Sequence, residues 1–99
     1  MIQIRRSNIY IKWLKKLQDR VGKALIAERI SRLQSGNAGD VRFVGDGIFE
    51  LRIHYGPGYR IYCKDTGKEI IILLCGGDKS TQQEDVEKAK KIAKLYKEE

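Results

Sequence analysis

The sequence predicts an α+β fold in which two N-terminal helices pack on a mostly antiparallel sheet and a C-terminal helix follows. Three observations lead to this prediction. Apolar residues recur at helical spacing in the first third of the chain and again near its end, and four short apolar runs separated by tight turns lie between them. The 99 residues suffice for one modest core, so we expect residues 1–99 to form a single domain.

The first third of the chain predicts a short strand and two helices. Ile2 and Ile4 alternate with polar residues, which is typical of a strand. Ser7 is a favourable first residue for a helix, and the polar, glycine-containing segment 18–22 indicates a break before the second helix. Residues 36–37, Gly-Asn, indicate where that helix ends. The apolar residues at helical spacing are Ile9, Trp13, Leu14, Leu17, Val21, Leu25, Ile26, Ile30 and Leu33.

The middle of the chain predicts an antiparallel meander. Its four apolar runs span residues 41–44, 48–55, 59–64 and 69–75. Asp46-Gly47 in the first turn is a strong hairpin signal, and Gly56-Pro57-Gly58 marks the second turn. Residues 70–74 are apolar on both strand faces, so we expect a central strand that is covered on both sides. The N-terminal helices can cover one face, and the other face needs the C-terminal helix or another protein.

A final helix is predicted after Gly76-Gly77. Ser80 with Gln83, or Thr81 with Glu84, has the spacing of a capping box. The remaining Lys and Glu residues of this helix are expected to face solvent. The apolar stripe that would pack on the sheet comprises Val86, Ala89, Ile92, Ala93 and Tyr96.

The composition favours an intracellular protein with an anionic partner. The net charge is +7, which suits a polyanion or an acidic protein. The longest apolar run, residues 70–75, is far shorter than the about 20 residues of a membrane span. The N-terminus lacks the apolar region of a signal peptide, so we expect a cytoplasmic location and no membrane contact. Cys63 and Cys75 lack metal-ligand spacing and the chain has one histidine, so we expect reduced cysteines, no metal site and no cofactor.

The segment from residue 49 to residue 83 carries more polar side chains than a sheet core requires. In the predicted strand, alternation places Glu50, Arg52 and His54 on one face and Leu51 and Ile53 on the other. A carboxylate, a guanidinium group and the chain's one imidazole on a single face are able to bind and cut a phosphodiester. We therefore predict a functional site here.

Metal-free RNA cleavage needs a base for the 2′-hydroxyl proton, an acid for the leaving 5′-oxygen and cations for the charge that develops on phosphorus. Arg52, Arg60 and Lys79 are the candidate cations, and Arg60 suits bidentate phosphate contact. His54 and Glu50 are the candidates for proton transfer. The sequence alone does not distinguish between these two.

Each of these side chains also has an ordinary structural interpretation. Glu50 and Arg52 have the spacing of a same-face ion pair on a strand. His54 stands at the end of a predicted strand, where an isolated histidine is commonly a surface residue. Tyr59 and Tyr62 fit either core aromatics or platforms on which RNA bases stack.

Several motifs together resemble those of a known family. They are residues 13–14 (WL), 17–19 (LQD), 29–30 (RI), 32–33 (RL), 36–40 (GNAGD), 50–53 (ELRI), 55–62 (YGPGYRIY) and 76–82 (GGDKSTQ). Through them nearly the whole chain resembles the RelE/ParE superfamily of bacterial toxins, most closely the HigB-like branch of addiction-module killer proteins. The last two motifs are the longest and the most specific.

The resemblance implies a twisted sheet like that of microbial ribonucleases. It also implies a toxin of a type II toxin–antitoxin system, with no cofactor. RNase members cut mRNA, usually in the ribosomal A site, through metal-free 2′-hydroxyl attack, whereas ParE-type members poison DNA gyrase. The implied partners are the ribosome, mRNA and a cognate antitoxin, a helix-turn-helix DNA-binding protein. The toxin would meet operator DNA only through the antitoxin complex.

The resemblance also suggests roles for individual residues. Arg60 matches the phosphate-binding arginine of the Gly-Tyr-Arg strand, and Lys79 falls where RNase members carry a basic residue after the last strand. Arg52 lies near their basic residues on the preceding strand. Glu50 and His54 stand where well-studied members place Lys or Arg, so the general base and acid stay open. An mRNA endonuclease, a gyrase poison and an inactive module that binds antitoxin and operator are the three candidate functions.

Overall fold

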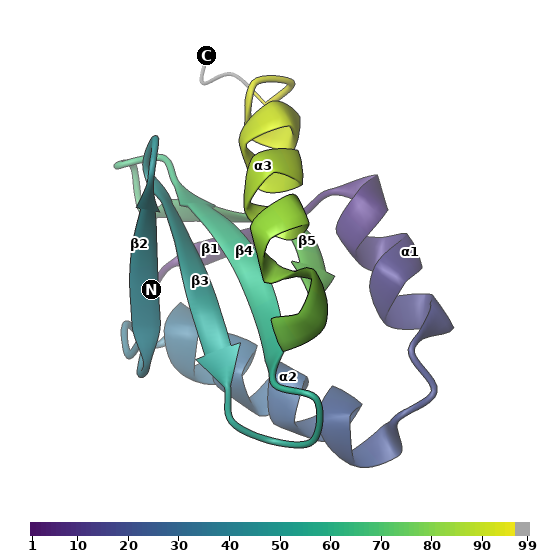
Figure 1. Ribbon diagram of the computed structural model, residues 1–99. Helices are drawn as coiled ribbons and strands as arrows, with labels where there is room; N and C mark the ends of the chain where they lie inside the picture. Colours follow the sequence, from purple (N-terminus) through teal and green to yellow (C-terminus); the bar gives the residue numbers. More distant parts are fainter. Residues whose placement is uncertain (97–99) are drawn as a thin grey trace.

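The computed structural model describes residues 1–96, which form a five-stranded sheet with helices on both faces (Figure 1). The elements in chain order are β1 (Gln3–Arg6), α1 (Asn8–Lys16), α2 (Arg20–Gln34), β2 (Val41–Gly45), β3 (Ile48–Ile53), β4 (Tyr59–Asp65), β5 (Ile70–Gly77), the 3-10 turn η1 (Lys79–Thr81) and α3 (Gln82–Ala93). The expected α+β fold with two N-terminal helices and a C-terminal helix is confirmed.

The sheet has the strand order β1-β5-β4-β3-β2. Strands β2 to β5 form the expected antiparallel meander. Strand β1 pairs in parallel with β5, which makes β5 a central strand between β1 and β4. The apolar run of β5 is therefore explained, since both faces of a central strand are available for burial.

Helices α1 and α2 cover one face of the sheet. Ile26, Ile30 and Leu33 of α2 are buried there with Leu51 and Ile61 of the sheet. These helical positions follow the spacing that the sequence shows, so the stripe of α2 is its buried face. Leu25 and Leu14 add partly buried contacts at the edge of this core.

Helix α3 covers the opposite face and lies across the sheet in Figure 1. Ala89 and Ile92 of α3 pack with Ile48, Tyr62 and Leu74. The sequence left open whether this face is covered by the C-terminal helix or by another protein, and α3 is the element that covers these residues. Among the helices within residues 1–96, none combines the length and apolar character needed to span a bilayer.

The start of α1 is fastened to β5. The fully buried Ser7 accepts a hydrogen bond from the Tyr10 N–H at 3.0 Å and donates one to the Leu74 carbonyl at 2.5 Å. The ring of Trp13 lies against Gly76, where a Cβ atom would come within 2.4 Å of the ring. A side chain at position 76 would thus push α1 away from the sheet.

The ends of two predicted strands move by two residues each in the structure. The strand expected over residues 48–55 ends at Ile53, because the Tyr55 N–H bonds to the Ile53 carbonyl and the Gly58 N–H bonds to the Tyr55 carbonyl. These bonds form a turn, so His54 lies beyond the strand. The strand expected to end at residue 75 continues to Gly77.

The predicted capping boxes before α3 are wrong. The observed box joins Asp78 and Thr81 around η1, one turn earlier in the chain. Thr81 begins α3 without a capping hydrogen bond from its side chain, and its hydroxyl instead donates to the Asp85 carboxylate at 2.6 Å. The Asp78 side chain accepts the Ser80 N–H at 2.8 Å. The Asp78 carboxylate therefore shapes this turn.

Asp19 begins α2 and connects it to β4. Its carboxylate accepts the Gly22 N–H at 2.9 Å and the Tyr59 hydroxyl at 2.7 Å. The pKa of Asp19 lies below its ordinary value because the Gly22 N–H, and then the Tyr59 hydroxyl, donate to the ionised carboxylate. The break predicted between the two N-terminal helices thus carries a capping residue that also contacts the sheet.

We expect replacement of Asp19 by asparagine to reduce the sensitivity of the fold to acid. A carboxylate whose folded-state pKa is lowered stabilises the fold above its ordinary pKa, and the stabilisation is lost as pH falls through the folded-state value. The thermal midpoint of the wild type should therefore fall more than that of Asp19→Asn between about pH 7 and about pH 3. Circular dichroism measures both midpoints.

The control for this measurement is Asp46→Asn, which removes an exposed carboxylate from the turn between β2 and β3. We expect Asp46→Asn to follow the wild type. An Asp19→Asn protein that loses as much stability in acid as the wild type would contradict the expectation.

Candidate functional site

The expected cations converge on a cleft where β3, β4 and η1 meet. The cleft has a volume of about 330 Å³ and is lined by Arg52, Ile53, His54, Tyr55, Gly56, Pro57, Gly58, Tyr59, Arg60 and Lys79. Three of these described residues are cations, one is the histidine and none is acidic. A concave surface with one sign of charge concentrates ligands of the opposite sign, so the cleft favours an anion.

Arg52 and Arg60 face each other across two strands. They are direct partners in the pairing of β3 with β4, which places their side chains on the same face of the sheet. Like charges in this position repel and destabilise a sheet. The Nε groups of both arginines are buried without a hydrogen-bond partner among the described residues. An anion bound beside the two guanidinium groups would offset the repulsion.

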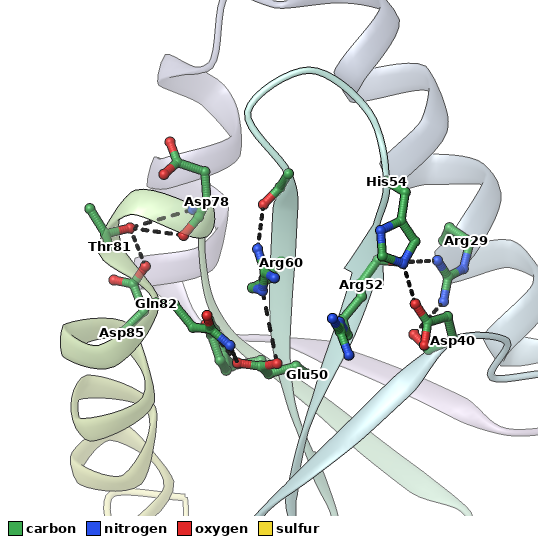
Figure 2. Close-up of polar contacts among 12 residues, drawn as sticks. Arg29, Asp40, Glu50, Arg52, His54, Arg60, Asp78, Thr81, Gln82 and Asp85 are labelled. Carbon is green, nitrogen blue, oxygen red and sulfur yellow. Dashed lines mark hydrogen bonds and ion pairs between the residues drawn. The ribbon is translucent and has the colours of Figure 1, made fainter.

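Glu50 is fully buried. Figure 2 shows it beside Arg60. Its Oε1 atom is 3.9 Å from the Arg60 Nε atom. Its Oε2 atom accepts hydrogen bonds from the Gln82 side chain at 2.8 Å and from the Tyr62 hydroxyl at 3.3 Å. A carboxylate with no exposed surface positions its neighbours and does not meet a ligand in solution.

The placement of Glu50 corrects two expectations. It shares a sheet face with Arg52, as predicted, but that part of the face is buried and does not form an open polar surface. Its ion-pair partner is Arg60 on the neighbouring strand and not Arg52 on its own. The Arg60 guanidinium also donates to the Gly58 carbonyl at 2.9 Å, so Arg60 is held from two sides.

Lys79 brings the third cation from η1. Its backbone N–H donates to the Pro57 carbonyl at 3.3 Å, which holds η1 against the loop between β3 and β4. The Lys79 side chain is exposed, and its residue lines the cleft together with Arg52 and Arg60. The three cations expected from the sequence are therefore brought together by three different elements.

His54 stands at the rim of the cleft and pairs with Asp40. Its Nε2 atom contacts the Asp40 carboxylate (Figure 2). The His54 and Asp40 side chains are 69% and 46% exposed. The hydrogen bond from His54 holds the pKa of Asp40 below its ordinary range. An exposed contact of this kind contributes little to stability. An imidazole that is oriented by a carboxylate and open to solvent has the arrangement of a proton-transfer group.

Arg29 is a positioning residue that the sequence analysis missed. This buried side chain of α2 donates to the carbonyls of Ala38 and Asp40, both at 3.0 Å, and to the carbonyl of Arg52. Burial is the main cause that lowers the pKa of Arg29. The guanidinium group joins the loop before β2 to the end of β3 and so places Asp40 beside His54. In the sequence, Arg29 stands three residues after Ile26 on the apolar stripe of α2, and this position could have indicated that its side chain is buried.

Tyr59 and Tyr62 lie in the core. Tyr59 is 6% exposed, meets Trp13 edge-on with ring centroids 6.4 Å apart and donates to Asp19. Burial, and then the hydrogen bond to Asp19, raises the pKa of Tyr59 to about 12. Tyr62 is fully buried and donates to Glu50. Of the two interpretations of these tyrosines, the placement supports core aromatics, because neither ring has an open face for a base.

Cys63 and Cys75 are buried with free thiols. Burial raises the pKa of Cys63 above its ordinary value and that of Cys75 to about 12. Thiols of this kind are poor nucleophiles near neutral pH. Within residues 1–96, no three His, Cys, Asp or Glu side chains are grouped as ligands for a metal ion.

Comparison with known proteins shows the family to which this chain belongs. The family model described as "Phage derived protein Gp49-like (DUF891)" matches residues 12–97, which include every residue of the cleft. The chain belongs to this Gp49-like family. It is also similar to an uncharacterized protein of Haemophilus influenzae, with 53% identity over 92 residues that cover 93% of each chain.

The Gp49-like family is a toxin-like family of the RelE/HigB type found in toxin–antitoxin systems. The broader part of the resemblance noted in the motifs is thereby confirmed. The family match also spans both long motifs, residues 55–62 and 76–82, and these supply Tyr55, Arg60 and Lys79 to the cleft.

In this Gp49-like protein we expect Arg60→Ala to destabilise the fold strongly. The variant leaves the buried Glu50 carboxylate without its cation, and breaking a buried pair in this way costs roughly 3–5 kcal/mol. The double variant Glu50→Gln/Arg60→Met removes both charges and should recover most of that loss. Urea unfolding measures the three free energies of unfolding, and a single variant as stable as the wild type would contradict the role of the pair.

Proposed function

We propose that this protein is the toxin of a type II toxin–antitoxin system and inhibits translation by metal-free cleavage of mRNA on the ribosome. The observation that carries this proposal is the cleft, in which Arg52, Arg60 and Lys79 surround a space that no described acidic residue lines. The exposed His54–Asp40 pair stands at its rim. Membership of a toxin-like family supports the same conclusion.

In the proposed mechanism the arginines bind the scissile phosphate. The guanidinium groups of Arg52 and Arg60, which line the cleft, donate to phosphate oxygens, and the exposed Lys79 adds a third cation. Negative charge grows on these oxygens as the 2′-oxygen attacks phosphorus. Preorganised cations stabilise that charge without reorganising, which is commonly the largest contribution to such a reaction.

His54 takes the proton of the 2′-hydroxyl in this mechanism. The sequence left His54 and Glu50 as alternatives, and burial removes Glu50 from contact with RNA. A positioned general base contributes about 10²–10⁴-fold to a rate. The bond from phosphorus to the 5′-oxygen then breaks and the 5′-oxygen takes a proton from water, which leaves a 2′,3′-cyclic phosphate and a 5′-hydroxyl. His54 returns the proton of the 2′-hydroxyl to water.

The proposal implies a cytoplasmic protein whose partners are the ribosome, mRNA and a cognate antitoxin with a helix-turn-helix DNA-binding domain. An acidic or amphipathic antitoxin segment laid over the cleft would neutralise the toxin, since the cleft is cationic. Operator DNA would be bound only by the complex with the antitoxin.

Induction of the protein in bacteria tests the proposal. We expect growth arrest and discrete in-frame cuts in cellular mRNA, mapped by primer extension. Lys79→Ala should reduce cutting by about 10²-fold, because it removes one cation from the transition state while the exposed side chain leaves the fold intact. Lys68→Ala removes the same charge from an exposed turn outside the cleft and should cut like the wild type.

The other outcomes of this experiment separate the alternatives. Intact mRNA together with induction of the DNA-damage response would indicate a gyrase poison. Induction without any growth defect would indicate an inactive module that only binds its antitoxin and operator. Equal cutting by Lys79→Ala and Lys68→Ala would show that Lys79 does not act in the reaction.

Asp40→Asn tests the role of the pair with His54. The variant keeps the size of the side chain but removes the carboxylate that orients the imidazole. We expect kcat to fall by up to about 10²-fold with KM unchanged, because the phosphate-binding arginines stay in place. Cleavage by programmed ribosomes measures both constants, with Asp46→Asn as the control. A change in KM alone would assign Asp40 to binding.

A further inference from the structure

Tyr55 is the exposed aromatic residue of the cleft. It is 37% exposed, whereas Tyr59 is 6% exposed and Tyr62 is fully buried. It lines the same cleft as Arg52, Arg60 and Lys79. An exposed aromatic ring beside a cationic groove is the arrangement with which proteins bind single-stranded nucleic acid, because every base has a flat face that can stack.

Three backbone hydrogen bonds tie the loop that carries Tyr55. The Tyr55 N–H bonds to the Ile53 carbonyl at 2.9 Å, and the Tyr55 carbonyl accepts the Gly58 N–H at 3.0 Å. The Pro57 carbonyl accepts the Lys79 N–H at 3.3 Å. Gly58 has a φ of +78°, and a Cβ atom there would lie 3.3 Å from the Lys79 Cβ atom, so glycine permits this close approach. A fixed backbone lowers the entropy lost when the ring binds a ligand.

We propose that Tyr55 forms a nucleobase-stacking subsite beside the phosphate site, and that it takes a base of single-stranded RNA. The subsite deepens the proposed function by naming how the RNA is recognised. A nucleotide carries both an anionic phosphate and a flat base, and the cleft of about 330 Å³ is lined by two guanidinium groups and by the exposed Tyr55. Purines have the larger face, so we expect them to bind more tightly than pyrimidines.

A fluorescent RNA tests the subsite without any cleavage. The probe is a short 2′-O-methyl RNA containing 2-aminopurine, which cannot react at the 2′-position and whose fluorescence is quenched when the base stacks. The wild type and Tyr55→Phe should quench it on binding. Tyr55→Ala and Tyr55→Leu should bind about 10-fold more weakly or worse and should not quench it.

Tyr96→Ala is the matched control. Tyr96 is also 37% exposed, but it follows α3 and does not line the cleft. This variant should bind and quench like the wild type. Quenching retained by both Tyr55→Ala and Tyr55→Leu, or absent from the wild type at saturating protein, would overturn the subsite.

Cleavage measured in parallel distinguishes failure of the subsite from failure of the proposed function. A wild type that cuts no mRNA, but whose quenching depends on Tyr55, refutes the nuclease and supports the subsite. A wild type that cuts mRNA, while Tyr55→Ala quenches and binds as the wild type does, refutes the subsite and leaves the nuclease standing.

Discussion

The buried ion pair between Glu50 and Arg60 is the interaction on which the rest of the site depends. Two arginines that face each other across β3 and β4 would repel, and the carboxylate beneath Arg60 offsets part of that repulsion. Glu50 also accepts a hydrogen bond from Gln82 at the start of α3. The helix that covers the sheet and the cation that faces the cleft are thus joined through one carboxylate, so the packing of α3 and the placement of Arg60 are coupled.

The cleft combines a rigid interior with an exposed rim. Arg60 is held by Glu50 and by the Gly58 carbonyl, whereas His54, Tyr55 and Lys79 have exposed side chains. Hydrogen bonds to backbone carbonyls hold the segments that carry the rim. Arg29 donates to the carbonyls of Ala38 and Asp40 in the loop before β2, and the Lys79 N–H of η1 donates to the Pro57 carbonyl. Charge is therefore preorganised where a phosphate would sit, while the groups that would meet the rest of an RNA remain accessible.

Much of the site could be predicted from the sequence. The contacts that could not be predicted all join residues that are far apart in the chain. Strand alternation and the family motifs led to Arg52, Arg60 and Lys79, which the structure brings together in one cleft. The contacts of Asp40 with His54 and of Gln82 with Glu50 join residues 14 and 32 positions apart. Contacts of this range depend on how loops close and helices dock, which local periodicity does not specify.

The sequence by itself determined the helices, the meander, the central position of β5 and the family, because side-chain direction and turn chemistry are local properties. Only the tertiary structure decided that β1 pairs in parallel with β5, that α3 covers the second face, and that Glu50 is buried while His54 is exposed. Alternation shows which face of a strand a residue occupies. Whether that face meets water depends on the element packed against it. Helix α3 packs on the face that carries Glu50, so this carboxylate is buried.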